Sequence, residues 1–244
     1  MKLGQYKALT FDCYGTLIDW ESGMVAGLQP LIGGAERQLT RNEILEAHAF
    51  HESTTQRQTP SKRYPDVLGT VYKRLAEEWS VPFSHEDCVA YGRSVADWPA
   101  FPDSADALRY LKKHYKLVIL SNVDNASFAA SDQRLQVAFD AIYTAEDVGS
   151  YKPAQGNFDY MLEMLPRLGV EKSAILHTAE SMFHDHVPAK ANGLASCWIY
   201  RRHDQDGFGA TMRPPLMPEP EFTFNSMAAL VEAHKAECAG QSHA

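Results

Sequence analysis

The sequence predicts an α/β protein with a three-layer core, in which helices cover both faces of a parallel sheet, plus an inserted helical cap. Two observations carry this prediction. Short apolar runs alternate with segments of helical spacing, which is typical of parallel sheets. One stretch, residues 19–99, interrupts the alternation, because it shows helical spacing and no convincing strand. We therefore expect a core of residues 1–18 and 100–244 and a helical cap of residues 19–99.

The core elements are expected in a regular order. The first strand is residues 8–11, and the chain resumes after the cap with a helix at 104–115 and a strand at 116–120. Further strands are expected at 141–144, 174–178, 196–200 and 222–224, further helices at 158–168 and 226–235, and cap helices at 42–51 and 67–79. A proline-rich loop is expected at 202–221 and a loose tail at 240–244.

Composition excludes several classes of function. The formal charge of −8 and the absence of a basic stripe argue against a nucleic-acid partner. No apolar run approaches the roughly 18 residues that cross a bilayer, and residues 1–7 run into a strand without a signal peptide, so we expect no membrane partner. Four widely spaced cysteines fit reduced thiols and a cytoplasmic location. The one dense cationic segment, residues 200–203, is either a strand end entering solvent or a substrate contact.

The most informative motif follows the first strand. Asp12 stands at its carboxyl end, where ligands of open α/β sheets collect. Gly15 and Thr16 let the backbone turn sharply and direct a hydroxyl toward whatever the carboxylate holds. Held in line with an electrophile, an ionised carboxylate here can act as a nucleophile.

Four signals recur in order along the chain, namely Asp12, then Ser121 closing the second strand, then Lys152, then Asp185. Together they resemble the haloacid dehalogenase superfamily, whose core is Rossmann-like. The motifs cover the catalytic half of the chain. Positive charge on Lys152 is expected to lower the pKa of Asp12 and to pair with a substrate carboxylate.

Tyr14 refines the resemblance, because superfamily phosphatases carry a second Asp there as general acid. The Asp-x-Tyr-Gly-Thr form resembles the type II 2-haloacid dehalogenase branch, which implies metal-free chemistry without a cofactor. The implied substrate is a small 2-substituted carboxylic acid. Asp12 would displace the leaving group from C2 with inversion, and water would then hydrolyse the ester to a 2-hydroxy acid. A magnesium-dependent phosphatase and a non-catalytic binding module are the rival interpretations.

The expected site residues fall into two groups. The catalytic set is Asp12, Lys152, Asp185, Ser121 and Thr16, and the substrate-binding set is Tyr14, Trp20, Asn122, Glu180 and His184. Several alternatives stay open. Asp185 orients water or holds Lys152; Asn122 could cap a helix, and Trp20 could pack at a hinge. A metal site built from His184, Asp185 and His186 is disfavoured, since adjacent ligands in an extended segment do not converge.

Some positions depart from the dehalogenase pattern. Glu180 and Met182 replace a Ser and an Asn near the nucleophile, and Phe158 replaces a Tyr. No clear cap Arg stands where the branch cradles halide, and His48 and His51 are the candidates in its place.

Local similarity suggests a second relative. The stretches 11–21, 98–103, 113–122, 177–181, 184–186 and 198–203 look like the azetidine-2-carboxylate hydrolase branch, which opens a strained amine ring by the same attack. A cationic ring nitrogen is stabilised by an aromatic face or by a carboxylate, and Trp20 and Glu180 are the candidates for these two contacts. Glu180 could instead bind water or a loop. The resemblance also implies a possible homodimer.

Overall fold

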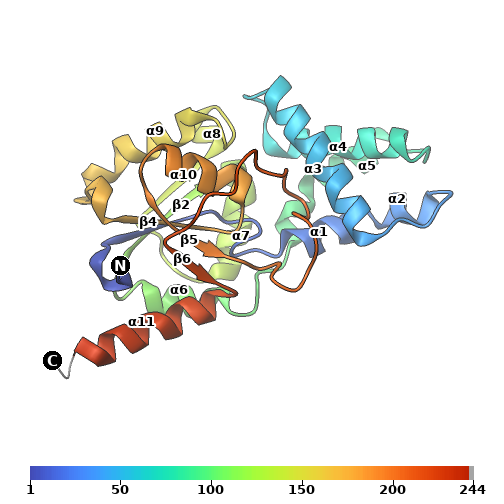
Figure 1. Ribbon diagram of the computed structural model, residues 1–244. Helices are drawn as coiled ribbons and strands as arrows, with labels where there is room; N and C mark the ends of the chain where they lie inside the picture. Colours follow the sequence, from blue (N-terminus) through green and yellow to red (C-terminus); the bar gives the residue numbers. More distant parts are fainter. Residues whose placement is uncertain (242–244) are drawn as a thin grey trace.

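The computed structural model describes residues 1–241 and contains a six-stranded sheet whose pairings are all parallel. The strand order is β3-β2-β1-β4-β5-β6 (Figure 1). The strands are β1 (Ala8–Phe11), β2 (Lys116–Ser121), β3 (Ala141–Thr144), β4 (Ile175–Ala179), β5 (Ala195–Ile199) and β6 (Phe222–Phe224). The α/β fold class with a parallel sheet is therefore confirmed.

Strand β1 lies in the middle of the sheet and fixes where the motifs meet. Phe11 pairs in register with Ile119 of β2 and with Thr178 of β4. Because parallel strands end at the same edge, the residues that follow β1, β2 and β4 come together there. Asp12 follows β1 directly, so it stands between the other two strand ends.

Helices cover both faces of the sheet, because side chains of each strand alternate between the faces. Val118 and Leu120 belong to one cluster with Phe158 of α9, whereas Leu117 and Ile119 belong to the larger cluster on the other face. Figure 1 shows α9 and α10 on one side of the sheet and α6 and α11 on the other. The core helices are α6 (Ser104–Leu111), α7 (Asn125–Leu135), α8 (Ala145–Val148), α9 (Gln155–Met164), α10 (Val187–Ala191) and α11 (Met227–Gln241).

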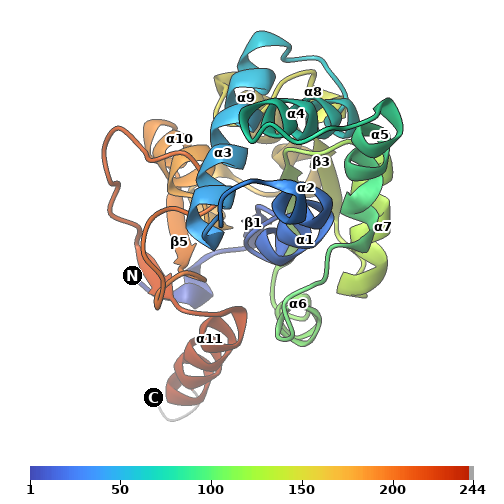
Figure 2. The same ribbon diagram turned by 90° about the vertical axis from the view of Figure 1, so that its right-hand side faces the viewer.

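Helices alone occupy the stretch expected as the cap. They are α1 (Trp20–Gly27), α2 (Gln29–Gly34), α3 (Arg41–Gln58), α4 (Tyr64–Glu78) and α5 (His85–Arg93). Capping boxes begin α3 at Thr40 and α5 at Ser84. Ile18 and Ala100, which flank the expected cap, form an antiparallel bridge. We call residues 19–99 the cap. Figure 1 shows its helices to the right of the sheet, and Figure 2 shows the same helices in front of the sheet. The division into two domains stays a prediction.

The structure corrects several predicted boundaries. The cap helix predicted at 42–51 is longer in the structure, because α3 begins at Arg41, after the capping box at Thr40, and continues to Gln58. The helix expected at 104–115 ends at Leu111, and the one expected at 158–168 starts at Gln155 and closes as a 3₁₀ turn over Leu165–Leu168. The tail expected at 240–244 starts inside α11, and residues 242–244 lie outside the described residues. Within the described part of the chain, none of the helices has the length and apolarity that a bilayer crossing requires.

Candidate active site

Asp12 is held at the strand edge by the turn that follows it. Gly15 has a φ of +93°, a conformation that side chains with a Cβ rarely adopt, and this turn brings Thr16 back toward Asp12. The Thr16 hydroxyl donates to Oδ2 of Asp12 at 2.9 Å and accepts from the backbone N–H of Glu180 at 2.9 Å. Asp12 is only 6% exposed. The turn therefore fixes one carboxylate oxygen and shields the group from bulk water.

Lys152 connects the two carboxylates that the sequence placed at the site. Its Nζ donates to Oδ1 of Asp12 at 2.9 Å, to Oδ1 of Asp185 at 2.8 Å and to the carbonyl of Leu120 at 2.8 Å. All three protons of the ammonium group are therefore used, and the side chain is 1% exposed. This geometry brings together residues that lie 140 and 33 positions apart in the chain.

Asp185 lies in a π-helical turn over Met182–His186, a distortion that is frequent at functional sites. Its Oδ1 also bonds Nε2 of His177 at 2.9 Å, and Nδ1 of His177 bonds the hydroxyl of Thr10 at 2.8 Å. Sequence reasoning missed His177 as a site residue. A polar residue inside an otherwise apolar buried strand is the signal that could have found it.

The pKa shifts follow from burial and from this shared cation. Burial raises the pKa of Asp12 and Asp185 adds to it, while Lys152 and Thr16 act in the opposite direction. Burial also opposes ionisation of Asp185, but Lys152 and His177 hold its pKa well below the usual range. Lys152 thus lowers the pKa of Asp12 as predicted, yet the net shift is upward because desolvation outweighs one shared cation.

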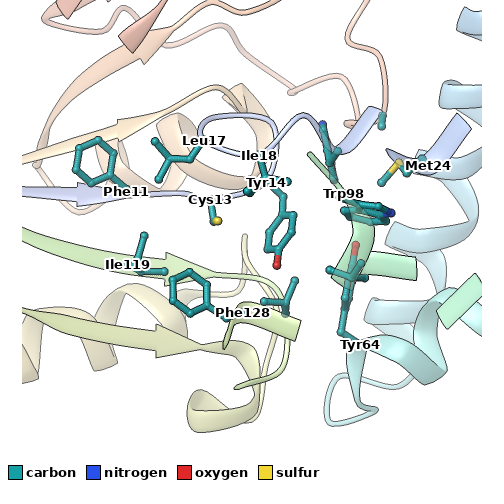
Figure 3. Packing of buried hydrophobic residues seen from close by; sticks show 14 of the residues in the cluster. Phe11, Cys13, Tyr14, Leu17, Ile18, Met24, Tyr64, Trp98, Ile119 and Phe128 are labelled. Carbon is teal, nitrogen blue, oxygen red and sulfur yellow. The ribbon is translucent and has the colours of Figure 1, made fainter. Parts of the chain in front are cut away.

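Two predicted substrate contacts are used for structure instead. Both amide atoms of Asn122 bond the backbone of Lys152, since Oδ1 accepts from its N–H at 2.6 Å and Nδ2 donates to its carbonyl at 3.0 Å. The hydroxyl of Tyr14 bonds Ser131 Oγ at 2.8 Å, and its ring meets Trp98 edge-on. Figure 3 shows the Tyr14 ring between core residues and the cap. Asn122 therefore positions Lys152, and Tyr14 can offer substrate only its ring.

Two cavities are lined by residues that bond Asp12 or belong to the turn after it, and the other predicted contacts line these cavities. One, of about 320 Å³, is lined by Lys152 and His184. The other, of about 130 Å³, is lined by Gly15, Trp20 and Glu180. Burial raises the pKa of Glu180 to about 8, helped by the charges of Glu21 and Asp12, so its carboxyl group is mostly protonated at neutral pH.

Ser121 ends β2 beside these groups with a buried hydroxyl. Its Oγ has no hydrogen-bond partner among the described residues, and the residue is 2% exposed. A buried hydroxyl without a partner carries a desolvation cost that a ligand atom can relieve. The Ser121 hydroxyl is therefore available to a ligand atom, and its role in the site stays a prediction.

Arginines that the sequence left open or overlooked lie close to the site. Arg201 donates to the carbonyl of Thr16 through Nε and Nη2 at 3.1 and 3.0 Å, and Arg202 bonds Glu21 at 2.6 Å. Neither enters solvent, because each side chain is at most 10% exposed. Arg41 of the cap lines the 130 Å³ cavity, 3.9 Å from Glu21.

The histidines expected as halide contacts lie away from Asp12. His48 is buried inside the cap against the ring of Tyr91, and His51 bonds Glu78 at 2.7 Å. Neither lines the two cavities described above. Arg41 in one cavity and Arg57 in the other are the cap cations that the sequence argument missed.

The residues do not fit a resident divalent cation. Asp12 and Asp185, the carboxylates that would be first choices as ligands, both bond the Lys152 ammonium. The neighbouring histidines turn elsewhere: His184 bonds Ser181 Oγ at 3.1 Å, and His186 bonds the carbonyl of Ala179 at 2.9 Å. Across residues 1–241, no group of three or more His, Cys, Asp or Glu side chains could hold a metal ion.

A parallel sheet with a helical insertion after its first strand, and a buried Asp–Lys–Asp cluster at the strand ends, is the architecture of a class of hydrolase. A family match covers residues 6–178, and its description is haloacid dehalogenase-like hydrolase. The chain belongs to this family. Among curated proteins it is 23% identical over 202 residues to YfnB of Bacillus subtilis (strain 168), named as a HAD-hydrolase, covering 80% of this chain and 84% of that protein.

Solved structures share the architecture. The L-2-haloacid dehalogenase RSc1362 superposes with a TM-score of 0.76 at 22% identity, covering 94% of this chain and 99% of its own. The L-2-haloacid dehalogenase of Xanthobacter autotrophicus, with chloropropionic acid covalently bound, gives 0.75 at 19% identity, covering 94% and 98%. At these identities the likeness describes the fold.

Proposed function

We propose that this hydrolase displaces a leaving group from C2 of a small 2-substituted carboxylic acid through an Asp12 ester. The arrangement that carries the proposal is the single ammonium of Lys152, bonded to Asp12 and Asp185 at 2.9 and 2.8 Å. Tyr14 occupies the position where the superfamily phosphatases carry a second Asp, and its hydroxyl bonds Ser131, so the proton donor that a phosphate ester needs is absent from that position.

In the first step, a carboxylate oxygen of Asp12 attacks C2 from the side opposite the leaving group. The new C–O bond forms as the C2 bond to the leaving group breaks, and the leaving group takes the electron pair. Thr16 and Lys152 orient the two oxygens of Asp12, and the Ser121 hydroxyl is free to donate to the substrate carboxylate. Fixed orientation of a modest nucleophile is the main source of acceleration here.

In the second step, water attacks the carbonyl carbon of the Asp12 ester. The tetrahedral intermediate releases the 2-hydroxy acid as an alkoxide that takes up a proton, and the Asp12 carboxylate is regenerated with one oxygen from water. Asp185 suits both roles that the sequence left open, because Oδ1 holds Lys152 while the buried Oδ2 has no partner among the described residues and can orient the water.

Halide is the leaving group that we propose first, which makes the protein a 2-haloacid dehalogenase. The covalently bound chloropropionic acid in the Xanthobacter autotrophicus enzyme supports a covalent intermediate on this fold. The free thiols Cys13, Cys88 and Cys197 support a reducing, cytoplasmic setting.

One observation favours a strained ring amine, as in L-azetidine-2-carboxylate, as the second candidate. Trp20 and Glu180 line the same small cavity beside Gly15, where an indole face and a carboxylate suit a cationic nitrogen. Because the pKa of Glu180 is about 8, turnover of a ring amine should rise as the pH passes through about 8. Glu180→Gln should abolish that rise and leave halide displacement largely intact.

The direct test is turnover of L-2-chloropropionate and L-azetidine-2-carboxylate in excess chelator, with product followed by mass spectrometry. In ¹⁸O-water, a single turnover should place one ¹⁸O in Asp12 and none in the hydroxy acid, since the first product oxygen comes from the enzyme. Label in the first-turnover product would overturn the ester mechanism. If neither substrate is turned over and the protein releases phosphate from a phosphate ester only when magnesium is present, the phosphatase interpretation would replace this proposal.

A further inference from the structure

The cavity of about 320 Å³ lies between the cap and the core and borders the catalytic candidates. The cap contributes Ser53, Gln56 and Arg57 near the end of α3, together with Pro60. The core contributes Lys152 with its neighbours in the chain, and Phe183 and His184 of the π-helical turn. Lys152 joins this cavity to the nucleophile, because its ammonium group bonds Asp12.

The charge of this cavity is unusual for the chain. No Asp or Glu lines it, although the protein carries a formal charge of −8. Arg57 is exposed and makes no hydrogen bond or ion pair with another described residue, so its charge is free. His184 is neutral near pH 7, since burial lowers its pKa to about 4. Arg57 is therefore the one lining cation whose charge is not already paired, because Lys152 is paired with two carboxylates.

The other cavities near the cap differ in this respect. The 130 Å³ cavity is lined by Asp19, Glu21 and Glu180 beside its arginines, and a third cavity, of about 630 Å³, is lined by Asp66 and Asp124. An anion that approaches an acidic protein meets net repulsion except where positive charge is concentrated. Of these three cavities, only the one that Arg57 lines presents a free cation without a carboxylate.

We propose that Arg57 determines specificity by binding the carboxylate of the substrate at the mouth of this cavity. The substrate then passes through the cavity toward Lys152 and Asp12. This inference rests on the proposed function and adds the entry route and the residue that recognises the anion. Arg57 is a substrate-binding residue in this role and takes no part in bond making or breaking. Its effect should appear in KM and in the dependence of kcat/KM on ionic strength, because such attraction is screened by salt.

The test compares Arg57→Gln, Arg57→Lys and the wild-type enzyme on L-2-chloropropionate at several salt concentrations. Loss of one cation facing the substrate at contact distance is expected to raise KM on the order of fivefold, with kcat nearly unchanged. Wild-type kcat/KM should fall as salt is added, the Gln variant should respond less, and the Lys variant should stay close to wild type. Arg167→Gln, which removes another exposed arginine, is the matched control and should change neither value.

Two further measurements separate this inference from the proposed function. The uncharged 2-chloropropionamide should be insensitive to Arg57→Gln, because it lacks the carboxylate. Binding of propionate, a carboxylate without a leaving group, should weaken in the Gln variant even if the wild-type enzyme turns over neither substrate. Equal propionate binding by both proteins, or equal KM and salt dependence, would overturn the role of Arg57 whatever the reaction proves to be.

Discussion

Two buried polar clusters of this molecule are built in opposite ways. At the sheet edge, Asp12, Lys152, Asp185 and His177 form a chain of hydrogen bonds at 2.8–2.9 Å. Inside the cap, both ring nitrogens of His48 lack a hydrogen-bond partner among the described residues, although the side chain is fully buried. Burial also raises the pKa of the cap residue Glu52 to about 7, so part of it is protonated near neutral pH.

The difference shows how the sheet edge and the cap interior each accommodate buried polar groups. Buried charges are tolerated only when they are paired, and the strand ends of the core supply that pairing from three separate parts of the sequence. The cap instead contains the buried His48 ring without a hydrogen bond, 3.6 Å from Glu52, which costs stability and makes no contact with Asp12. Changes at the sheet edge should therefore act on turnover, and changes inside the cap should act on stability.

The largest effect is expected from Asp12→Asn. An amide cannot form the ester, so turnover should fall by about 10⁴-fold or more. The fold should persist, because Asn keeps the shape and removes a carboxylate whose pKa burial raises. An activity assay beside a circular dichroism melt checks both statements. Residual activity within tenfold of wild type would remove Asp12 from the reaction.

Lys152→Ala should be nearly as damaging, with a loss of about 10³-fold, because Asp12 and Asp185 then share a buried site without a cation. Removing one partner of such a buried network costs about 3–5 kcal/mol. The pH dependence of stability should also change. In wild type, the contribution of Asp185 is complete above the unfolded carboxyl pKa of 3.8 and is lost as the pH falls toward its depressed folded pKa. In the variant both carboxyl pKa values should lie above their unfolded values, so stability should fall as the pH rises from about 4. Melting temperatures of both proteins between about pH 3 and pH 8 test this change.

His177→Gln should have an intermediate effect. The ring links Asp185 to Thr10 of β1, so the variant loosens the group that holds Lys152 without touching the nucleophile. We expect kcat to fall about 10–100-fold, in the range typical for an outer partner of a catalytic group. The acid limb of the pH–rate profile should shift, because Asp185 loses a donor that lowers its pKa. An unchanged profile would reduce His177 to a packing residue.

The core was predictable because its information is local. Strand residues 141–144 and 222–224 were placed correctly from apolar runs alone, and residues that follow neighbouring parallel strands must meet. Asp12, Lys152 and Asp185 were therefore assembled correctly at one place. The predictions that were wrong concerned side chains whose hydrogen-bond partners lie far away in the sequence.

Asn122 illustrates the limit. An amide after a strand can face a ligand or a backbone, and only the fold brings the Lys152 backbone, 30 residues away, within its reach. Arg202 shows the same limit at a separation of 181 residues, since its partner Glu21 lies on the first cap helix. Propensity and spacing describe one element at a time, so pairing between elements is invisible to them.

The smallest effect, and the one that sharpens the contrast most, is expected from His48→Phe. The ring stays similar in size and can keep its edge contact with Tyr91, while two nitrogens without hydrogen bonds are removed, one of which lies 3.6 Å from Oε2 of Glu52. Replacing an unsatisfied buried polar group by an apolar one of similar shape should be neutral or stabilising by about 1 kcal/mol. Turnover should stay within twofold, as His48 lines neither cavity beside Asp12. Urea unfolding and steady-state assays of the same preparation measure both effects. A clear loss of activity would mean that the cap interior contributes to the chemistry. The sheet-edge cluster would then not be the only one of the two clusters that acts on turnover.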